Sequence, residues 1–230
     1  MSVNMRPEEI EAESFRIIEA EVGAHSWSPA EWPVVRRAIH TSADFDYARS
    51  MLFSHDAVTS GVAAIRQGRG IVTDTTMALA GISKPRLERF GIAAACFVAD
   101  PQVAREAGTR GITRSILAMR KGAADPGNGI FVIGNAPTAL FELMRLIKEE
   151  GVRPDLIIGL PVGFVGAAES KERLISEATE LKTPFIANRG RKGGSNVAAA
   201  VVNALLIMAE NPPKFIIEGN PSICRGERKA

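Results

Sequence analysis

From residue 70 onward the chain alternates short, strongly apolar runs with longer stretches of helical character. Runs such as 130–133 and 156–158 are apolar at every position rather than at every second one, which is typical of parallel strands that helices cover on both faces. The pattern therefore predicts an α/β fold, with a doubly wound, mostly parallel sheet and helices on both faces. The predicted strands are 70–74, 92–98, 130–133, 156–158 and 184–187, alternating with helices such as 136–150 and 194–210.

Two segments before the first of these strands place apolar side chains at helical spacing. They are 7–22 and 28–41, and Pro29 suits the first turn of the second segment. We therefore expect two amphipathic N-terminal helices. A chain of 230 residues is long enough for one sizeable core, which predicts a single domain over 1–230 with an irregular tail over about 211–230.

Composition and charge argue against several classes of partner. The 28 Lys and Arg residues nearly balance the 26 Asp and Glu residues, so the net charge of +2 does not predict nucleic-acid binding. Every apolar stretch is shorter than the roughly 20 residues that a membrane helix needs, and the acidic N-terminus lacks a signal-peptide pattern. We expect a cytoplasmic protein without membrane or nucleic-acid partners.

The candidate ligand-binding loops follow the predicted strands directly, because parallel sheets bind ligands beyond the carboxyl ends of their strands. They are 73–76, 134–137, 159–166 and 188–196. The glycines at 159, 163 and 166 are four and three residues apart, whereas a dinucleotide fingerprint needs two and three, and the last loop lacks the GK[ST] end of a P-loop. A nucleotide-dependent enzyme is therefore disfavoured.

The last of these loops is basic and leads into the predicted helix 194–210. It has no acidic residue nearby in the sequence, so exposed amides and three cations could together bind several carboxylates, the alternative being a solvated turn. Ser195 or Asn196 is expected to cap the helix. The loop carries Arg189, Arg191, Lys192, Gly193, Gly194, Ser195 and Asn196.

His40 is the most promising of the three histidines as a proton donor. It lies at the end of the predicted helix 28–41, with Arg37 three residues earlier on the same helical face and the polar Thr41 and Ser42 directly after it. An imidazole readily exchanges a proton near neutral pH, so His40 is a candidate acid catalyst, although a lone histidine is often structural.

Other catalytic motifs are weaker. Asp44 and Asp74 are minor candidates for a general base, and Asp74 is more simply explained as the N-cap of a helix that follows the first strand. The sequence contains no HExxH motif, paired histidines or cysteine cluster, so no metal site is predicted.

Seven colinear segments resemble the precorrin-8X methylmutase family, also called precorrin isomerases or, in the anaerobic pathway, cobalt-precorrin-8 methylmutases. The resemblance implies an α/β homodimer with active sites near the subunit interface and no cofactor. It also implies an isomerase of cobalamin biosynthesis, which moves a methyl group from ring carbon 11 to carbon 12 of precorrin-8X or cobalt-precorrin-8 and gives hydrogenobyrinate or cobyrinate. The segments are 10–21, 36–48, 71–82, 111–120, 134–147, 157–174 and 189–206.

The resemblance implies roles for individual residues. His40 corresponds to the proposed proton donor, and Ser14 and Arg37 match family residues that contact the substrate. The positions expected to bind the rest of the acidic corrinoid are Thr41, Ser42, Arg114, Arg189, Arg191, Lys192, Gly193, Ser195 and Asn196.

A suprafacial methyl shift along a conjugated ring needs no nucleophile or redox partner, so neither a cofactor nor a metal is expected. The main alternative is a non-catalytic corrinoid carrier, which would keep the basic loops but need no proton donor. His40 beside Arg37 argues against the carrier.

Overall fold

The structure is a computed structural model that describes residues 6–211. A six-stranded sheet has the strand order β1-β6-β5-β4-β2-β3. The strands are β1 (Met51–Phe53), β2 (Gly70–Thr73), β3 (Ala94–Cys96), β4 (Asn128–Ile133), β5 (Leu156–Gly159) and β6 (Phe185–Asn188). The helices are α1 (Pro7–Val22), α2 (Trp32–Ser42), α3 (Tyr47–Ser50), α4 (Ala57–Arg66), α5 (Thr76–Gly81), α6 (Lys84–Arg89), α7 (Pro101–Arg110), α8 (Arg114–Ala123), α9 (Pro137–Glu150), α10 (Ala167–Ser176), α11 (Ala178–Leu181) and α12 (Ser195–Glu210).

The sheet confirms the predicted α/β fold and its mostly parallel pairing. β2 to β6 pair in parallel, whereas β1 pairs antiparallel with β6 at one edge. β1 was not predicted, because three residues are too few to show a period. At the opposite edge, β3 is shorter than the predicted strand 92–98.

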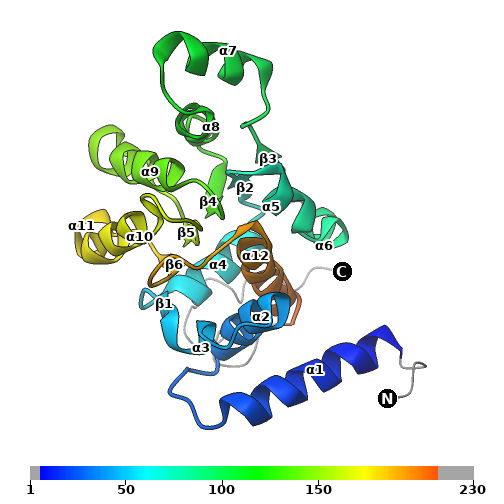
Figure 1. Cartoon of the computed structure of the whole chain (residues 1–230). Helices are drawn as coiled ribbons and strands as arrows, with labels where there is room; N and C mark the ends of the chain where they lie inside the picture. The colour runs from blue at the N-terminus through cyan, green and yellow to red at the C-terminus, as the bar shows by residue number, and fades with distance from the viewer. Residues whose placement is uncertain (1–5, 212–230) are drawn as a thin grey trace.

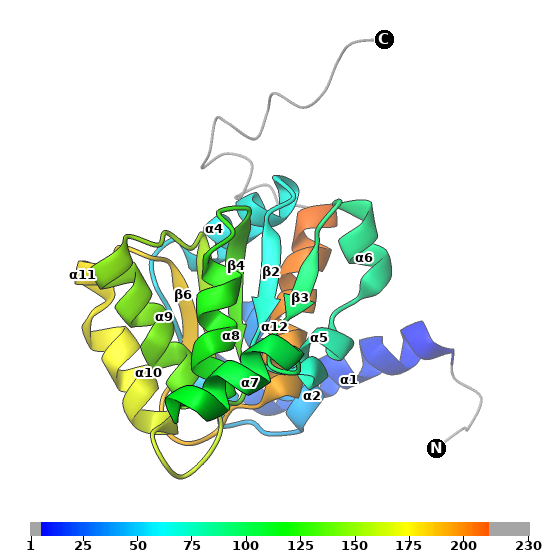
Figure 2. The ribbon, with the colours of Figure 1, turned by 90° about the horizontal axis from the view of Figure 1, so that it is seen from above.

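Both faces of the sheet are covered, which explains the unbroken apolar runs. In β4, Ile130 and Val132 join one hydrophobic cluster, whereas Phe131 and Ile133 join the other. Helices α2, α4 and α12 lie on the first face, and α8, α9 and α10 lie on the second (Figures 1 and 2). All four of these β4 side chains are buried as a result.

α12 is the central helix of the first face. It packs against the sheet on one side and against α2, α4 and α5 on others. Its apolar side chains are therefore buried nearly all round, as Val201 and Leu205 illustrate, both with no exposed surface. α12 begins at the carboxyl edge of the sheet, where the predicted ligand loops lie.

The two predicted N-terminal helices are present. α1 has the predicted bounds and lies along the outside of the body beside α2 (Figure 1). α2 begins at Trp32 rather than at 28, because the Ser28 hydroxyl donates to the Glu31 carboxylate at 2.7 Å and closes a separate turn before the helix. Of the predicted tail 211–230, only Asn211 falls within the described residues.

None of the helices between residues 6 and 211 is both long enough and apolar enough to cross a membrane.

Candidate functional site

The chain reverses its direction across the sheet at β2, since β3 lies on one side of it and β4, β5 and β6 follow on the other. Ligands of doubly wound sheets bind at the carboxyl ends of the strands on either side of such a point. Here Asp74, at the end of β2, has 1% of its surface exposed. Its carboxylate accepts hydrogen bonds from the backbone N–H groups of Gly134 (2.9 Å), Asn135 (2.9 Å) and Ala136 (2.7 Å).

These three bonds fix the turn into α9 with one of the chain's own carboxylates. Burial raises the pKa of Asp74, and the three amide donors oppose that rise. The backbone N–H groups at the start of α9 therefore already bind a carboxylate of the protein itself. The predicted ligand loop 134–137 anchors the end of β2. The predicted role of Asp74 as the cap of the next helix is wrong, because Thr75 caps α5 by accepting from the Ala78 N–H at 3.1 Å.

Ser195 links the loops after β2 and β4 to the start of α12. Its hydroxyl lies 2.7 Å from the Thr75 hydroxyl, and a Cβ atom on Gly134 would lie 2.7 Å from the Ser195 Cα. The prediction that Ser195 or Asn196 caps α12 is wrong, because Gly194 occupies the N-cap position and no side chain caps the helix. The loops after β2 and β4 thus meet at the first residue of α12.

The loop after β5 also reaches the start of α12, where it contacts Gly193 of the basic loop. A Cβ atom there would lie 2.2 Å from the Leu160 carbonyl oxygen and 2.7 Å from that of Pro161, so only glycine fits. The Gly194 N–H also donates to the Leu160 carbonyl at 2.9 Å. The basic loop is therefore packed tightly against the loop 159–166.

Two of the three cations in the basic loop have acidic partners within the fold. Arg189 pairs with Glu172 of α10 at 2.9 Å, and Lys192 pairs with Asp44 at 2.6 Å and Asp46 at 2.5 Å. Lys192 lowers the pKa of Asp44, and the two carboxylates raise the pKa of Lys192. Folding brings these acids to the loop from distant parts of the chain.

Arg191 and Arg114 differ, since neither forms an ion pair within residues 6–211 and both are exposed. Arg114 is the first residue of α8, and the preceding Thr113 donates from its hydroxyl to that of Thr138 in the first turn of α9, at 3.2 Å. This contact places Arg114 at the carboxyl edge of the sheet, on the same edge as Arg191.

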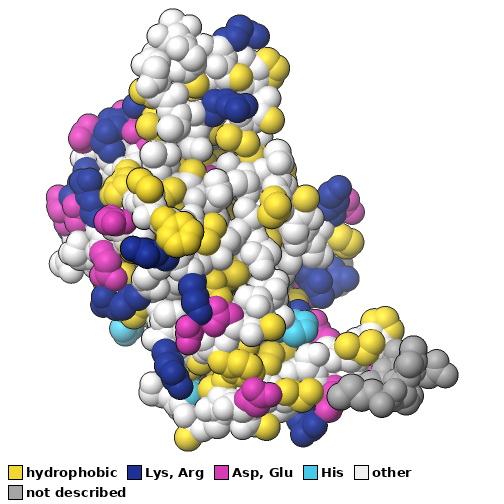
Figure 3. Space-filling view, viewed as in Figure 1, with side chains coloured by type: hydrophobic (Ala, Val, Ile, Leu, Met, Phe, Trp, Pro, Cys, Tyr) yellow, Lys and Arg dark blue, Asp and Glu magenta, His cyan; other side chains and the backbone are white. Residues whose placement is uncertain are grey.

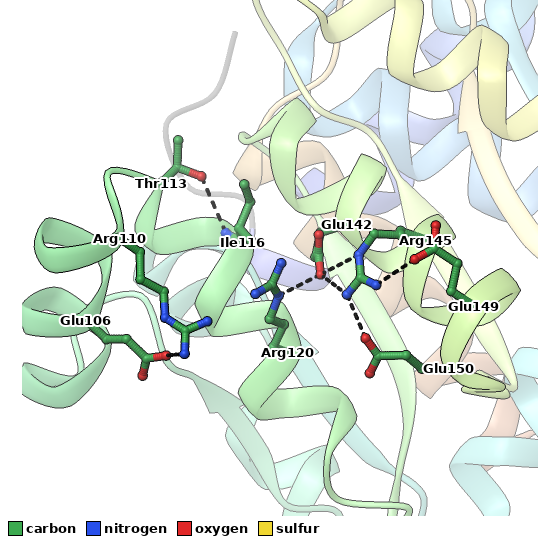
Figure 4. A network of polar contacts seen from close by, with 9 residues as sticks. All are labelled: Glu106, Arg110, Thr113, Ile116, Arg120, Glu142, Arg145, Glu149 and Glu150. Atoms are coloured by element: carbon green, nitrogen blue, oxygen red, sulfur yellow. Dashed lines mark hydrogen bonds and ion pairs between the residues drawn. The ribbon is translucent and has the colours of Figure 1, made fainter.

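Two arginines further along α8 and α9 form ion pairs within the protein instead. Glu142, with 7% of its surface exposed, accepts hydrogen bonds from Arg120 at 2.7 Å and Arg145 at 2.6 Å (Figure 4). Arg145 also binds Glu149 and Glu150. This network fastens α8 to α9 and engages both guanidinium groups within the fold.

Lys171 is a functional candidate that the sequence reasoning missed. It has no exposed surface, and its ammonium group donates to the Asn188 side-chain oxygen at 3.0 Å and to the Lys192 carbonyl at 2.6 Å. Burial lowers its pKa to about 8. Lys171 is four residues after Ala167 and three before Leu174, so helical periodicity places it on the buried face of α10. This spacing in the sequence could have predicted that Lys171 is buried.

His40 belongs to α2, and its ring packs against Phe15 of α1. Its ring centroid is 5.2 Å from that of Phe15 in an edge-on arrangement, and the guanidinium carbon of Arg37 lies 5.0 Å from the same ring. Arg37 also binds Glu11 at 2.6 Å. The predicted shared face of Arg37 and His40 is thereby confirmed, and α1 supplies the aromatic surface that orients both side chains.

The hydroxyl groups predicted near His40 have different surroundings. Ser14 donates to the Ile10 carbonyl at 2.8 Å, and Ser42 donates to the Ala38 carbonyl at 2.8 Å, so each is bonded within its own helix. Thr41 is exposed. Of the three, Thr41 is the one whose side chain has no hydrogen bond within the described residues.

The turn after α2 connects the His40 region to the basic loop. Asp44, four residues after His40, binds Lys192, and the Tyr47 hydroxyl donates to the Gly193 carbonyl at 3.3 Å. Burial raises the pKa of Tyr47 to about 12, so it remains a donor at neutral pH. Since α2 also packs along α12, His40 and the basic loop are held in one rigid assembly (Figure 1).

A profile of the precorrin-8X methylmutase family matches residues 9–208. The chain belongs to this family. It is 48% identical over 209 residues to the cobalt-precorrin-8 methylmutase of Priestia megaterium, covering 91% of each protein. It is 38% identical over 192 residues to the precorrin-8X methylmutase of a Sinorhizobium species, covering 84% of this chain and 90% of that protein.

A crystal structure of precorrin-8X methylmutase from Thermus thermophilus matches the fold with a TM-score of 0.79. It is 40% identical, and the match covers 88% of this chain and 98% of that one. The family match spans the His40 region, the ends of β2 and β4 and the basic loop, so all three belong to the methylmutase domain. Within residues 6–211, no three His, Cys, Asp or Glu side chains are grouped as a metal would require.

Proposed function

We propose that this chain is an isomerase of cobalamin biosynthesis that shifts the methyl group from ring carbon 11 to carbon 12 of precorrin-8X or cobalt-precorrin-8. The product is hydrogenobyrinate or cobyrinate. The observation that carries the proposal is the family match over residues 9–208, which includes His40 and the basic loop. The relatives at 48% and 38% identity carry methylmutase names of the cobalt and the metal-free type, respectively.

His40 is the acid in this proposal. Its protonated imidazole gives a proton to the corrinoid ring, the methyl group migrates between adjacent ring carbons, and the proton returns as the conjugated product forms. No atom is gained or lost overall. Protonation withdraws electron density from the framework around the migrating group, which is the contribution expected of general acid catalysis. Phe15 supports this step by fixing the orientation of the imidazole ring.

The cations near the carboxyl edge are proposed to bind the acetate and propionate groups of the substrate. Arg191 and Arg114 are the strongest candidates because they have no acidic partner within residues 6–211. Arg37, Arg189 and Lys192 already hold carboxylates of the protein, which a substrate carboxylate would join or displace.

The remaining predicted contacts divide into three kinds. Thr41 and Asn196 are exposed and can meet the ligand directly, whereas Ser14 and Ser42 would share hydroxyl groups already bonded to the helix backbone. Gly193 and Ser195 shape the backbone at the start of α12. We assign these two a role in positioning the amides of this loop.

The proposal extends to assembly and location. We infer a cytoplasmic homodimer of single-domain subunits, with active sites near the interface. α1 supports the dimer, because Ile10 (52% exposed) and Ile17 (38% exposed) present apolar surface on a helix at the outside of the body. Light scattering on the purified protein should give twice the chain mass, and a monomer would contradict the dimer.

The function is tested by mixing the purified protein with metal-free and with cobalt-containing precorrin-8X and following the absorption spectrum. Catalytic conversion of either compound identifies the isomerase and its pathway. Tight binding of both without conversion would favour the carrier.

A further inference from the structure

Phe164 and Val165 expose almost their entire side chains. They are 84% and 90% exposed, and they lie at the tip of the loop between β5 and α10. Burying a large apolar side chain is favourable, so a pair of such residues left in water is an unusual feature of a folded surface. The pair is available to an apolar ligand.

The backbone conformation of the loop keeps the Phe164 and Val165 side chains exposed. Gly163 and Gly166 flank the pair with φ angles of +140° and +80°, which other residues rarely adopt. The Gly163 N–H donates to the Arg191 carbonyl at 3.2 Å, and the Gly166 carbonyl accepts from the Ser170 N–H at 2.9 Å. Both ends of the tip are therefore anchored, one to the basic loop and the other to α10.

A cation lies beside the apolar tip. The guanidinium carbon of Arg191 is 5.6 Å from the centroid of the Phe164 ring, and Arg191 is exposed without an ion-pair partner in residues 6–211. Figure 3 shows apolar and basic side chains next to one another over the loop that precedes α10. The surface is thus apolar with a positive charge at its side.

We propose that Phe164, Val165 and Arg191 form a binding site for a flat, apolar macrocycle that carries carboxylates on its rim. Phe164 and Val165 contact the face of the ring, and Arg191 binds a rim carboxylate. The inference rests on the proposed function, which supplies such a ligand in the corrinoid substrate.

The chemistry of the three side chains matches this ligand. An aromatic ring packs in offset or edge-on contact with another conjugated system, and the guanidinium group can bind a carboxylate through two parallel hydrogen bonds. The location fits as well, because the tip follows the carboxyl end of β5, and Gly193 packs against the start of the same loop. Arg191 therefore connects the tip to the start of α12.

The test compares two corrinoids that share the same macrocycle but differ in whether the rim groups are charged. Cobyrinic acid carries the free carboxylates, whereas its heptamethyl ester carries none. Their dissociation constants are measured by absorbance titration for the unaltered protein, Phe164→Ala and Arg191→Gln. The matched control for the arginine is Arg105→Gln, because Arg105 is an exposed arginine on α7 without an ion pair in the described residues.

We expect Phe164→Ala to weaken binding of both probes by about tenfold and Arg191→Gln to weaken binding of cobyrinic acid alone by about tenfold. The Arg105→Gln control should change either constant by less than about twofold. Both altered side chains are exposed, so thermal unfolding should match that of the unaltered protein.

Unchanged binding by Phe164→Ala, or failure of the unaltered protein to bind cobyrinic acid, would overturn the site. Conversion of a dimer to a monomer by Phe164→Ala would instead identify this surface as an interface between two copies. A protein that binds cobyrinic acid through Phe164 but converts no precorrin-8X contradicts the proposed isomerase and leaves the binding site standing. A protein that converts precorrin-8X while Phe164→Ala binds normally contradicts the binding site alone.

Discussion

The Asp74 carboxylate lies 2.7 Å from the Ala136 amide nitrogen, between the ends of β2 and β4. This contact and its two neighbours hold the beginning of α9 against the end of β2. Doubly wound proteins bind ligands at the carboxyl ends of such strands, so a buried carboxylate here stabilises the framework on which the surrounding loops rest.

Asp74→Asn should lower the free energy of unfolding by about 3 kcal/mol. The amide keeps one acceptor oxygen, but its NH₂ group faces backbone N–H donors that then lack a partner in a buried place. Chemical denaturation measures the loss. Asp125→Asn is the matched control, since the exposed Asp125 accepts from a single backbone N–H and should cost less than about 1 kcal/mol. Equal effects of the two substitutions would contradict the role of Asp74 in holding α9 against the end of β2.

Gly193→Ala should destabilise the protein by about 1–3 kcal/mol and weaken corrinoid binding, because its Cβ atom would collide with two backbone carbonyls. Gly108→Ala in α7 is the control, since nothing lies within 4 Å of its Cβ position. The control should be neutral or stabilising by up to about 1 kcal/mol. A Gly193→Ala protein with unchanged stability and binding would show that the two loops are not tightly packed.

Lys171 gives a prediction about pH. Its pKa is about 8 in the folded state against 10.5 ordinarily, so between these values the unfolded chain binds more protons than the folded protein. Burying the Lys171 charge therefore lowers the free energy of unfolding by its full amount below pH 8. This loss disappears as the pH rises to 10.5. The stability of the unaltered protein relative to Lys171→Met should therefore increase by roughly 3 kcal/mol across this window. A difference that does not vary with pH would contradict the lowered pKa.

Arg114→Gln should weaken binding of cobyrinic acid by about tenfold, and raising the salt concentration should reduce the difference from the unaltered protein. Arg189→Gln should have an effect below about threefold, because Arg189 is already paired with Glu172. Titrations at two salt concentrations measure both effects. Equal losses in the two variants would show that the ion pair does not decide which cation binds the substrate.

The sequence predicted those parts of the fold that a regular pattern encodes. β4 and β5 are buried on both faces and so give unbroken apolar runs, and α1 shows a clear helical period. β1 escaped prediction because it has three residues and owes its place to pairing with β6. The start of α2 was misplaced because a side-chain hydrogen bond of Ser28 closes a turn there.

The candidate site was predictable only where its residues are neighbours in the sequence. Arg37 and His40 are three residues apart on one helix, and the structure confirms their common face. The acid partners of the basic loop are 17 and 146 positions away, so the sequence alone could not show that Arg189 and Lys192 are paired. The acceptors of Lys171 are also distant in the sequence, since Asn188 ends β6 and Lys192 lies in the loop after it.

The most direct test of the central claim is a comparison of His40→Ala with the unaltered protein in a single turnover of precorrin-8X, with and without cobalt. We predict that the rate falls by about 10²–10⁴-fold while the dissociation constant for cobyrinic acid and the unfolding temperature stay nearly unchanged. A His40→Ala protein that converts the substrate at a comparable rate would contradict the role of His40 as the acid.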